Sequence, residues 1–195
     1  MARARSTSSG SSKTPKLLVI SGPSGAGKTT IASAVLARRP DILPSVSMTT
    51  RRPRRGEKDG VQYRFVSDDV FDATAAAGGF LEHAVVHGNR YGTPKEPVEK
   101  ALADGKSVLL EIDVQGSRAV RDAVPGAVLI FVEPPSREVL RERLHRRKTE
   151  DDASFSLRMR NAEAEMEAAD EFDHAVVNDD LEGAVSEVLR ILETA

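Results

Sequence analysis

Gly22-Pro23-Ser24-Gly25-Ala26-Gly27-Lys28-Thr29 is the stretch that decides the fold of this chain. It matches the pattern G-x-x-x-x-G-K-[ST] at every position, and this pattern is typical of a phosphate-binding loop, or P-loop. The glycines of such a loop let backbone N–H groups surround a phosphate chain, while the lysine reaches the outer phosphates and the next hydroxyl binds Mg²⁺. The sequence therefore predicts a site for a nucleoside triphosphate with Mg²⁺, built from Gly22 to Thr29 and completed by Thr30.

The segments around the loop predict an α/β fold. An apolar run at 16–21 precedes the loop, and Ile31 and Val35 follow it at helical spacing, which indicates a strand, a turn and a helix. Near-continuous apolar runs are typical of parallel strands that are covered on both faces. Alternating strands and helices predict the three-layer fold of a P-loop NTPase with a central parallel sheet. Further strands are expected at 108–113, 127–132 and 175–177, and a last helix is expected after Asp179-Asp180.

Composition limits the class of protein. With 195 residues, no cysteine and a formal net charge of -2, the chain is expected to form one domain without disulfides or a cysteine-built metal site. The absence of cysteine is compatible with a reducing, cytoplasmic location. No apolar run approaches the roughly 20 residues of a membrane helix, so we expect no membrane partner. Residues 1–15, rich in Ser, Thr and Gly, are predicted to be a disordered tail.

Two segments interrupt the alternation of strands and helices. Residues 44–94 carry short, mixed signals, with a helix expected at 68–77, and they predict a small β-rich insertion. Residues 145–152 have no apolar side chain to anchor them, so a charged ligand would have to hold them, as in a mobile lid. We expect the core at 16–43, 95–142 and 159–195, and the lid at about 143–158. A stripe at helical spacing runs from the end of the lid into the last core segment and predicts core packing. It consists of Phe155, Met159, Ala162 and Met166.

Positive charge is concentrated in two places. The run RRPRR contains Arg51, Arg52, Arg54 and Arg55, and alone it would be typical of a localisation signal or a nucleic-acid patch. A second basic cluster extends through 137–148 and continues with Arg158 and Arg160. Because the net charge is close to zero, we do not expect nucleic acid as a partner. Two separated clusters suggest two anionic ligands, or one ligand held from two sides.

Four segments resemble guanylate kinases, in matching order along the chain. They are SVSMTTRRPRRGEKDGVQYRF at 45–65, FLEH at 80–83 with GNRYGT at 88–93, EIDVQG at 111–116 and VNDD at 177–180. The resemblance implies a guanylate kinase domain over 16–195, with a GMP-binding segment at 44–94. It implies reversible, Mg²⁺-dependent transfer of the γ-phosphoryl group of ATP to GMP, giving ADP and GDP.

The resemblance also implies which side chains bind GMP. Guanine presents adjacent N–H donors that one carboxylate can accept together, and a carbonyl to which a hydroxyl can donate. Arginine suits the phosphate because its planar fork binds two oxygens and keeps its charge. Positions matching Arg51, Arg54, Tyr63 and Tyr91 hold the phosphate of GMP, those matching Ser47, Glu82 and Thr93 read its base, and Asp113 and Arg158 lie close to it.

On the ATP side, the resemblance implies that arginines of the lid close onto the phosphates. Lys28, Arg51, Arg143, Arg147 and Arg158 are the expected catalytic residues, and Asn178 is expected beside the adenine. Arg146 stands next to Arg147, so the sequence leaves open which of the two reaches inward. Thr29 is the expected Mg²⁺ ligand and Glu111 is expected to act through water, although the division of roles between Glu111 and Asp113 also stays open.

Two other functions compete with this one. Guanylate-kinase-like domains also exist as interaction modules without activity, and a related kinase could phosphorylate a different acceptor. The complete P-loop argues against the first, and Ser47, Glu82 and Thr93 argue against the second. The oligomeric state does not follow from the sequence.

Overall fold

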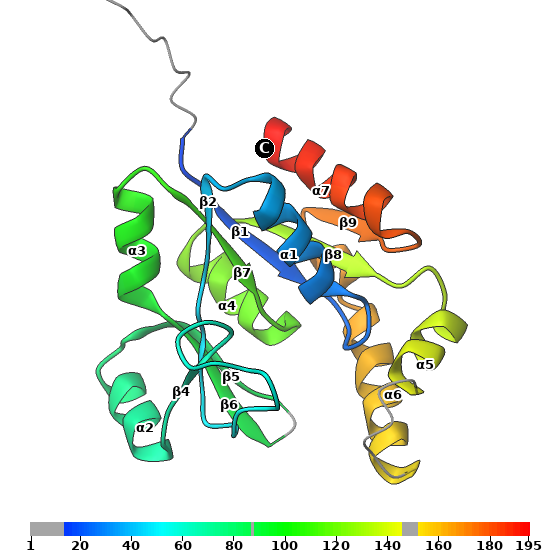
Figure 1. Cartoon of the computed structure of the whole chain (residues 1–195), viewed down its shortest axis with the longest axis horizontal. Coiled ribbons are helices and arrows are strands. Elements are labelled where there is room, and N and C mark those ends of the chain that lie inside the picture. The colour runs from blue at the N-terminus through cyan, green and yellow to red at the C-terminus, as the bar shows by residue number, and fades with distance from the viewer. Residues whose placement is uncertain (1–13, 87, 146–151) are drawn as a thin grey trace, which may run out of the picture.

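The computed structural model describes residues 14–86, 88–145 and 152–195. A five-stranded sheet forms the centre of the fold, and all its strands are parallel, in the order β2-β7-β1-β8-β9 (Figure 1). The expected parallel sheet is therefore confirmed. The strands are β1 (Leu17–Ser21), β2 (Ile42–Pro44), β7 (Ser107–Glu111), β8 (Val128–Glu133) and β9 (His174–Val177).

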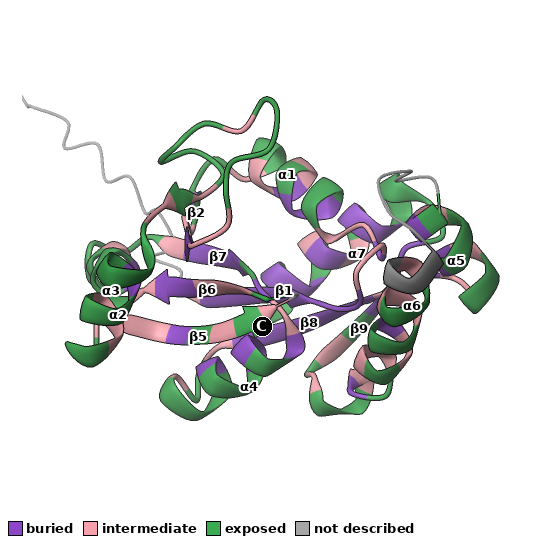
Figure 2. Ribbon diagram, turned by 90° about the horizontal axis from the view of Figure 1, so that it is seen from below, coloured by how far each residue is buried: buried purple, intermediate pink, exposed green. Residues whose placement is uncertain are grey.

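Helices cover both faces of this sheet because alternate side chains of its strands point to opposite faces. Leu18 and Ile20 of β1 pack in one core with side chains of α1 (Lys28–Arg38) and α7 (Leu181–Thr194). Leu17 and Val19 pack in a second core with side chains of α3 (Lys95–Ala103) and α4 (Val114–Ala123). The resulting three layers bury the central strands almost completely (Figure 2).

A second, smaller sheet interrupts the chain between β2 and α3. Its order is β4-β3-β6-β5, with antiparallel β3–β6 and β5–β6 pairs and a parallel β3–β4 pair, so the expected β-rich insertion is confirmed. Within the insertion β4 is only two residues long, and Tyr63 before it forms an isolated bridge with Asp59. The elements are β3 (Met48–Thr49), β4 (Arg64–Phe65), α2 (Asp68–Ala76), β5 (Phe80–Val86) and β6 (Asn89–Pro94).

Helices α5 (Arg137–His145) and α6 (Asp152–Met166) form a hairpin beside the P-loop (Figure 1), and a short 3₁₀ turn (Ala169–Glu171) follows α6. Leu140 and Leu144 of α5 are buried together with Ala162 of α6. The expected stripe of Phe155, Met159, Ala162 and Met166 packs in this cluster, as the spacing predicted. The tail predicted for 1–15 falls, apart from Thr14 and Pro15, outside the described residues, and so do Arg146, Arg147 and much of the segment proposed as a lid.

One expected strand end is wrong. The run at 108–113 was expected to be a strand throughout. The strand ends at Glu111, and Asp113 is instead the N-cap of α4, where its side chain accepts a hydrogen bond from the N–H of Gly116 at 2.8 Å. Aspartate at this position satisfies a backbone donor that the first turn of a helix leaves free, which favours ending the strand here.

Candidate active site

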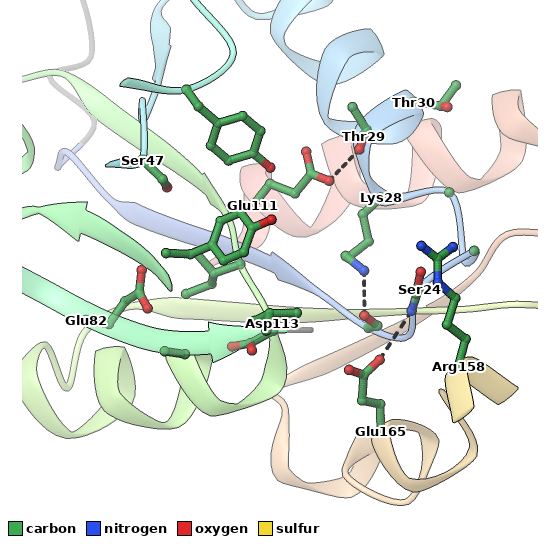
Figure 3. Close-up of a pocket in the computed structure, with 18 of the residues that line it drawn as sticks. Ser24, Lys28, Thr29, Thr30, Ser47, Glu82, Glu111, Asp113, Arg158 and Glu165 are labelled. Carbon is green, nitrogen blue, oxygen red and sulfur yellow. Dashed lines mark hydrogen bonds between the residues drawn. The ribbon is translucent and has the colours of Figure 1, made fainter. Parts of the chain in front are cut away.

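A cavity of about 280 Å³ opens between the P-loop, the small sheet and helix α6 (Figure 3). The P-loop forms one wall, and the small sheet forms the wall that faces it. The two walls bring together residues that lie far apart in the sequence. The lining includes Gly22, Ser24, Gly25, Gly27, Lys28, Thr29 and Thr30 on the first wall, Ser47, Arg54, Tyr63, Glu82 and Tyr91 on the second, and Glu111, Asp113, Arg158 and Glu165 between them.

The P-loop has the backbone shape that its glycines predict. Gly27 is the N-cap of α1 and has a φ of 97°, a left-handed conformation that side chains rarely adopt. A Cβ at this position would also collide with the side-chain amide of Asn178. Lys28 folds back over the loop, and its Nζ donates to the carbonyl oxygens of Gly22 at 2.6 Å and Pro23 at 3.1 Å.

The outer side of the loop is held by residues that were expected to contact ATP. Asn178 donates from Nδ2 to the carbonyl oxygen of Ala26 at 2.6 Å. Arg143 donates to the carbonyl oxygens of Asn178 at 2.9 Å and of Ala26 at 3.4 Å. In this conformation both side chains therefore brace the loop from behind and do not line the cavity.

Thr29 and Glu111 place two oxygen ligands at the start of α1. The hydroxyl of Thr29 donates to Oε1 of Glu111 at 2.5 Å. A hydroxyl and a carboxylate are the hard oxygen ligands that Mg²⁺ prefers, so the residues fit this ion. Within the part of the chain that the structure describes, no group of three or more His, Cys, Asp or Glu side chains is placed to hold a metal ion.

Glu82 is a buried carboxylate on the wall opposite the P-loop. Its exposed fraction is 6%, and Oε1 accepts a hydrogen bond at 2.6 Å from the hydroxyl of Thr93, which is fully buried. Burial raises the pKa of Glu82 to about 7, and the negative charge of Asp113 adds to the rise, while the hydrogen bond from Thr93 opposes it. The side chain has room because residue 116 is glycine: a Cβ there would lie 2.6 Å from Oε2 of Glu82.

Arg51 lies beside this wall and is held by Glu57. Its Nη1 and Nη2 donate to the two carboxylate oxygens of Glu57 at 3.0 and 2.9 Å, and its Nε donates to the hydroxyl of Tyr91 at 3.2 Å. The guanidinium also lies over the ring of Tyr63, 5.4 Å from the centroid. The hydrogen bonds from Arg51 lower the pKa of the Glu57 carboxyl, so the pair is ionised at neutral pH. Glu57 also accepts the N–H of Arg54 at 2.6 Å and thus fixes both arginines relative to each other.

Most of the predicted site residues gather at this cavity. Thr93 and Arg51 stand directly behind the lining and contact it through Glu82 and Tyr91. Pro23 and Ala26 belong to the loop but are not among the residues that line the cavity. Arg147 lies outside the described residues, so its predicted role stays a prediction.

Sequence reasoning missed two acidic residues of the site, Glu57 and Glu165. Glu57 stands close to the arginine run, but its neighbours in sequence are charged as well, so nothing marked it. Glu165 carried a usable signal, because it follows Arg158 by seven residues on α6 and therefore shares its helical face. Glu57 contacts the site through the guanidinium of Arg51, and Glu165 contacts it through the backbone N–H of Ser24.

Comparisons with known proteins show the family to which the chain belongs. A model of the family described as Guanylate kinase matches residues 14–195. A guanylate kinase of Leifsonia xyli subsp. xyli is 51% identical over 177 residues, which cover 90% of this chain and 70% of that protein. A guanylate kinase of Clostridium perfringens (strain SM101) is 49% identical over 176 residues, covering 90% and 82%. The crystal structure of guanylate kinase from Anaplasma phagocytophilum superposes with a TM-score of 0.79 at 34% identity, covering 93% of this chain and 87% of that chain.

Proposed function

Because this chain belongs to the guanylate kinase family and is a guanylate kinase, we propose that its cavity holds ATP along the P-loop and GMP against the small sheet. One observation carries the proposal: a complete P-loop and the buried Glu82–Thr93 pair face each other across a single cavity. The first is suited to a triphosphate, and the second is suited to a base with adjacent N–H donors.

The base of GMP is read by the Glu82 carboxylate. In its ionised form it accepts both the ring N–H and the amino N–H of guanine, while Thr93 holds its orientation and Ser47 lines the same wall. Adenine lacks this pair of donors, and each buried polar group left without a partner costs about 1 to 3 kcal/mol, and more when it is charged. Discrimination against AMP follows from this cost.

The phosphate of GMP is bound by Arg54, Tyr63 and Tyr91 in the cavity, with Arg51 directly behind them. A phosphate oxygen attacks the γ-phosphorus of ATP in line, and the bond between the γ-phosphorus and the bridging oxygen breaks, so ADP leaves with the electron pair. The nucleophile is already an anion at neutral pH, so the protein positions the reactants and offsets their charge. No covalent enzyme intermediate is required.

Charge on the donor side is offset by Lys28, whose Nζ already lies at the carbonyl oxygens of the loop. Thr29, with Glu111 acting through water, would hold Mg²⁺, which supplies charge neutralisation on the phosphates when it is bound. Asp113 lies on the acceptor side, and Arg158 lines the cavity from α6.

Closure of a lid at about 143–158 completes the proposed mechanism. Arg143, Arg147 and Arg158 would move toward the phosphates, which excludes water from the reacting group. Arg143 would then exchange its bonds to the carbonyl oxygens of Ala26 and Asn178 for bonds to phosphate, with Asn178 beside the adenine. We also propose a cytoplasmic location, since a chain without cysteine is compatible with a reducing compartment. No helix among the described residues is long and apolar enough to cross a membrane.

A coupled assay of ADP formation with GMP, AMP, dTMP and UMP tests the proposal. We expect GMP to be preferred in kcat/KM by a factor on the order of 10⁴, as for sites that hydrogen-bond a substrate group. Comparable rates with GMP and AMP would refute the role of Glu82. Binding of GMP without any turnover would point to an interaction module instead.

A further inference from the structure

Helix α6 brings a carboxylate to the P-loop as well as an arginine to the cavity. Oε2 of Glu165 accepts a hydrogen bond at 3.2 Å from the backbone N–H of Ser24, the third residue of the loop (Figure 3). Glu165 is half-buried, and both residues line the cavity. The contact joins parts of the chain that are 141 residues apart, so it exists only in the folded molecule.

The bond to Ser24 completes a set of restraints on the loop. Side chains donate to three of its carbonyl oxygens: Lys28 to those of Gly22 and Pro23, and Asn178 to that of Ala26. These restraints fix carbonyl groups, whereas Glu165 fixes an N–H group in the middle of the loop. A phosphate-binding loop binds its ligand only when its N–H groups point toward the phosphates. The orientation of this peptide therefore affects the affinity for the triphosphate.

The carboxylate itself is held in place by packing. Its neighbour Met166 and the buried Ala162, one turn earlier, pack in the cluster that joins α6 to Leu140 and Leu144 of α5. These leucines also lie against the loop, because a Cβ on Gly25 would come within 3.1 to 3.3 Å of their side-chain atoms. The packing of α6 on α5, and of α5 on the loop, thus places Glu165 beside Ser24.

Burial and neighbouring charges shift the pKa of the Glu165 carboxyl. Burial raises the pKa of Glu165, and the negative charge of Asp113 adds to the rise, while the positive charge of Lys28 and the N–H of Ser24 lower it. A carboxylate at this place would oppose the charge of ATP if it faced the phosphates directly. Its bond to the loop backbone indicates that its contribution is to orient the loop.

We propose that Glu165 is a positioning residue for the donor nucleotide: by holding the Ser24 N–H, it preorganises the P-loop for the triphosphate and ties the loop to the helix that carries Arg158. The inference rests on the proposed function, since it assumes that ATP binds at the P-loop. Groups held in their productive geometry before a ligand arrives need no rearrangement when it binds.

The test compares three variants in the full-length protein: Glu165→Ala, Glu165→Gln and the matched control Glu167→Gln, which changes an exposed glutamate two residues further along. Glutamine keeps an oxygen that can accept the Ser24 N–H, whereas alanine does not. The measurements are kcat and KM for Mg-ATP at saturating GMP, calorimetric titration of ADP and of GMP separately, and the melting temperature.

We expect Glu165→Ala to lower kcat/KM for ATP and the affinity for ADP about 10- to 100-fold, the range for a hydrogen bond to a charged group. Glu165→Gln should recover most of this loss, while the affinity of Glu165→Ala for GMP stays within about twofold of wild type. A lower melting temperature with unchanged ATP parameters would overturn the proposal, because Glu165 would then be structural only. A glutamine variant as impaired as alanine, or one that binds ATP more tightly than wild type, would also overturn it.

Two further controls separate this inference from the proposed function. If wild type binds ATP and Lys28→Ala does not, the P-loop is the donor site whatever the Glu165 variants do. If wild type itself fails to bind ATP, the proposed function fails with it.

Discussion

The raised pKa of Glu82 makes GMP binding depend on pH near neutrality. The empty site favours the protonated carboxyl, with a pKa of about 7, whereas guanine requires the ionised form as an acceptor. Binding must therefore release the proton, and affinity must rise with pH until the carboxylate is fully ionised. Measuring the affinity for GMP from pH 6 to pH 8, in wild type and in Glu82→Gln, tests this expectation.

The magnitude follows from the ionised fraction in the empty protein. With a pKa of about 7, that fraction is about one tenth at pH 6 and about nine tenths at pH 8. Because the apparent Kd equals the intrinsic Kd divided by the competent fraction, the apparent Kd for GMP should be about tenfold higher at pH 6. The second proton of the phosphate, with a pKa of about 6, adds roughly twofold in both proteins.

Isothermal titration calorimetry in two buffers of different ionisation enthalpy measures both quantities. At pH 6 wild type should release about 0.9 proton more per GMP bound than Glu82→Gln, which has no titrating group at this position. We also expect Glu82→Gln to bind GMP about 10- to 100-fold more weakly at pH 8, because its amide N–H₂ opposes the donors of guanine. Parallel pH profiles and equal proton release in the two proteins would refute the assignment of the carboxylate to the base.

The same shift predicts a gain in stability for the variant. Between about pH 4.5 and 7 the folded protein holds a proton on Glu82 that the unfolded chain has lost, so stability falls as pH rises through this window. The loss reaches about 3 kcal/mol above pH 7, at about 1.4 kcal/mol per pH unit. Urea unfolding without ligand should therefore show Glu82→Gln gaining stability over wild type at pH 8 relative to pH 5. A difference that does not change with pH would contradict this reasoning.

The remaining predictions concern the two walls and the hairpin. Lys28→Ala should lower kcat by about 10³ or more at an unchanged fold, checked by steady-state assay and circular dichroism; a rate near wild type would exclude its role. Glu57→Ala should weaken GMP binding about 10- to 100-fold and leave ADP binding unchanged in calorimetry, because Arg51 loses its anchor; unchanged GMP affinity would show that Arg51 needs no support. Leu140→Ala, at a fully buried position, should cost about 2 to 5 kcal/mol in urea unfolding, and a cost below about 1 kcal/mol would contradict the packing of the hairpin.

Much of the fold could be predicted because its signals are local. The P-loop motif and the apolar runs place β1, β7 and β8, and their alternation with helices requires a parallel sheet. The end of β7 was wrong because Asp113 has a local alternative, the N-cap of α4, that an apolar pattern does not reveal. The bonds of Glu57 to Arg51 and Arg54, which hold the first part of the loop before β4, could not be predicted from local patterns either.

The residues of the site also differ in whether a local signal in the sequence reveals them. Lys28, Thr29 and Glu82, which line the cavity, could be predicted because a motif or a family resemblance names them directly. Glu165 was not predicted, because its spacing from Arg158 indicates only that the two residues share a face of α6, whereas its contact with Ser24 depends on where α6 passes relative to the P-loop. The position of Arg143 behind the loop is likewise a property of one conformation and could not be read from the chain.

The smaller sheet is formed by one continuous segment, which is inserted into the chain between β2 and α3. β2 ends at Pro44, the chain returns to the core in α3 from Lys95, and every strand pair of the larger sheet lies outside this stretch. A transplant of residues 45–94 from a kinase with another acceptor would thus leave the strand pairs of the larger sheet in place, whereas the contacts of β5 with α3 and α4 and the bond from the N–H of Ser45 to the carbonyl oxygen of Leu109 would need refitting. The architecture therefore places the residues that select the acceptor in one segment, which could be exchanged as a unit.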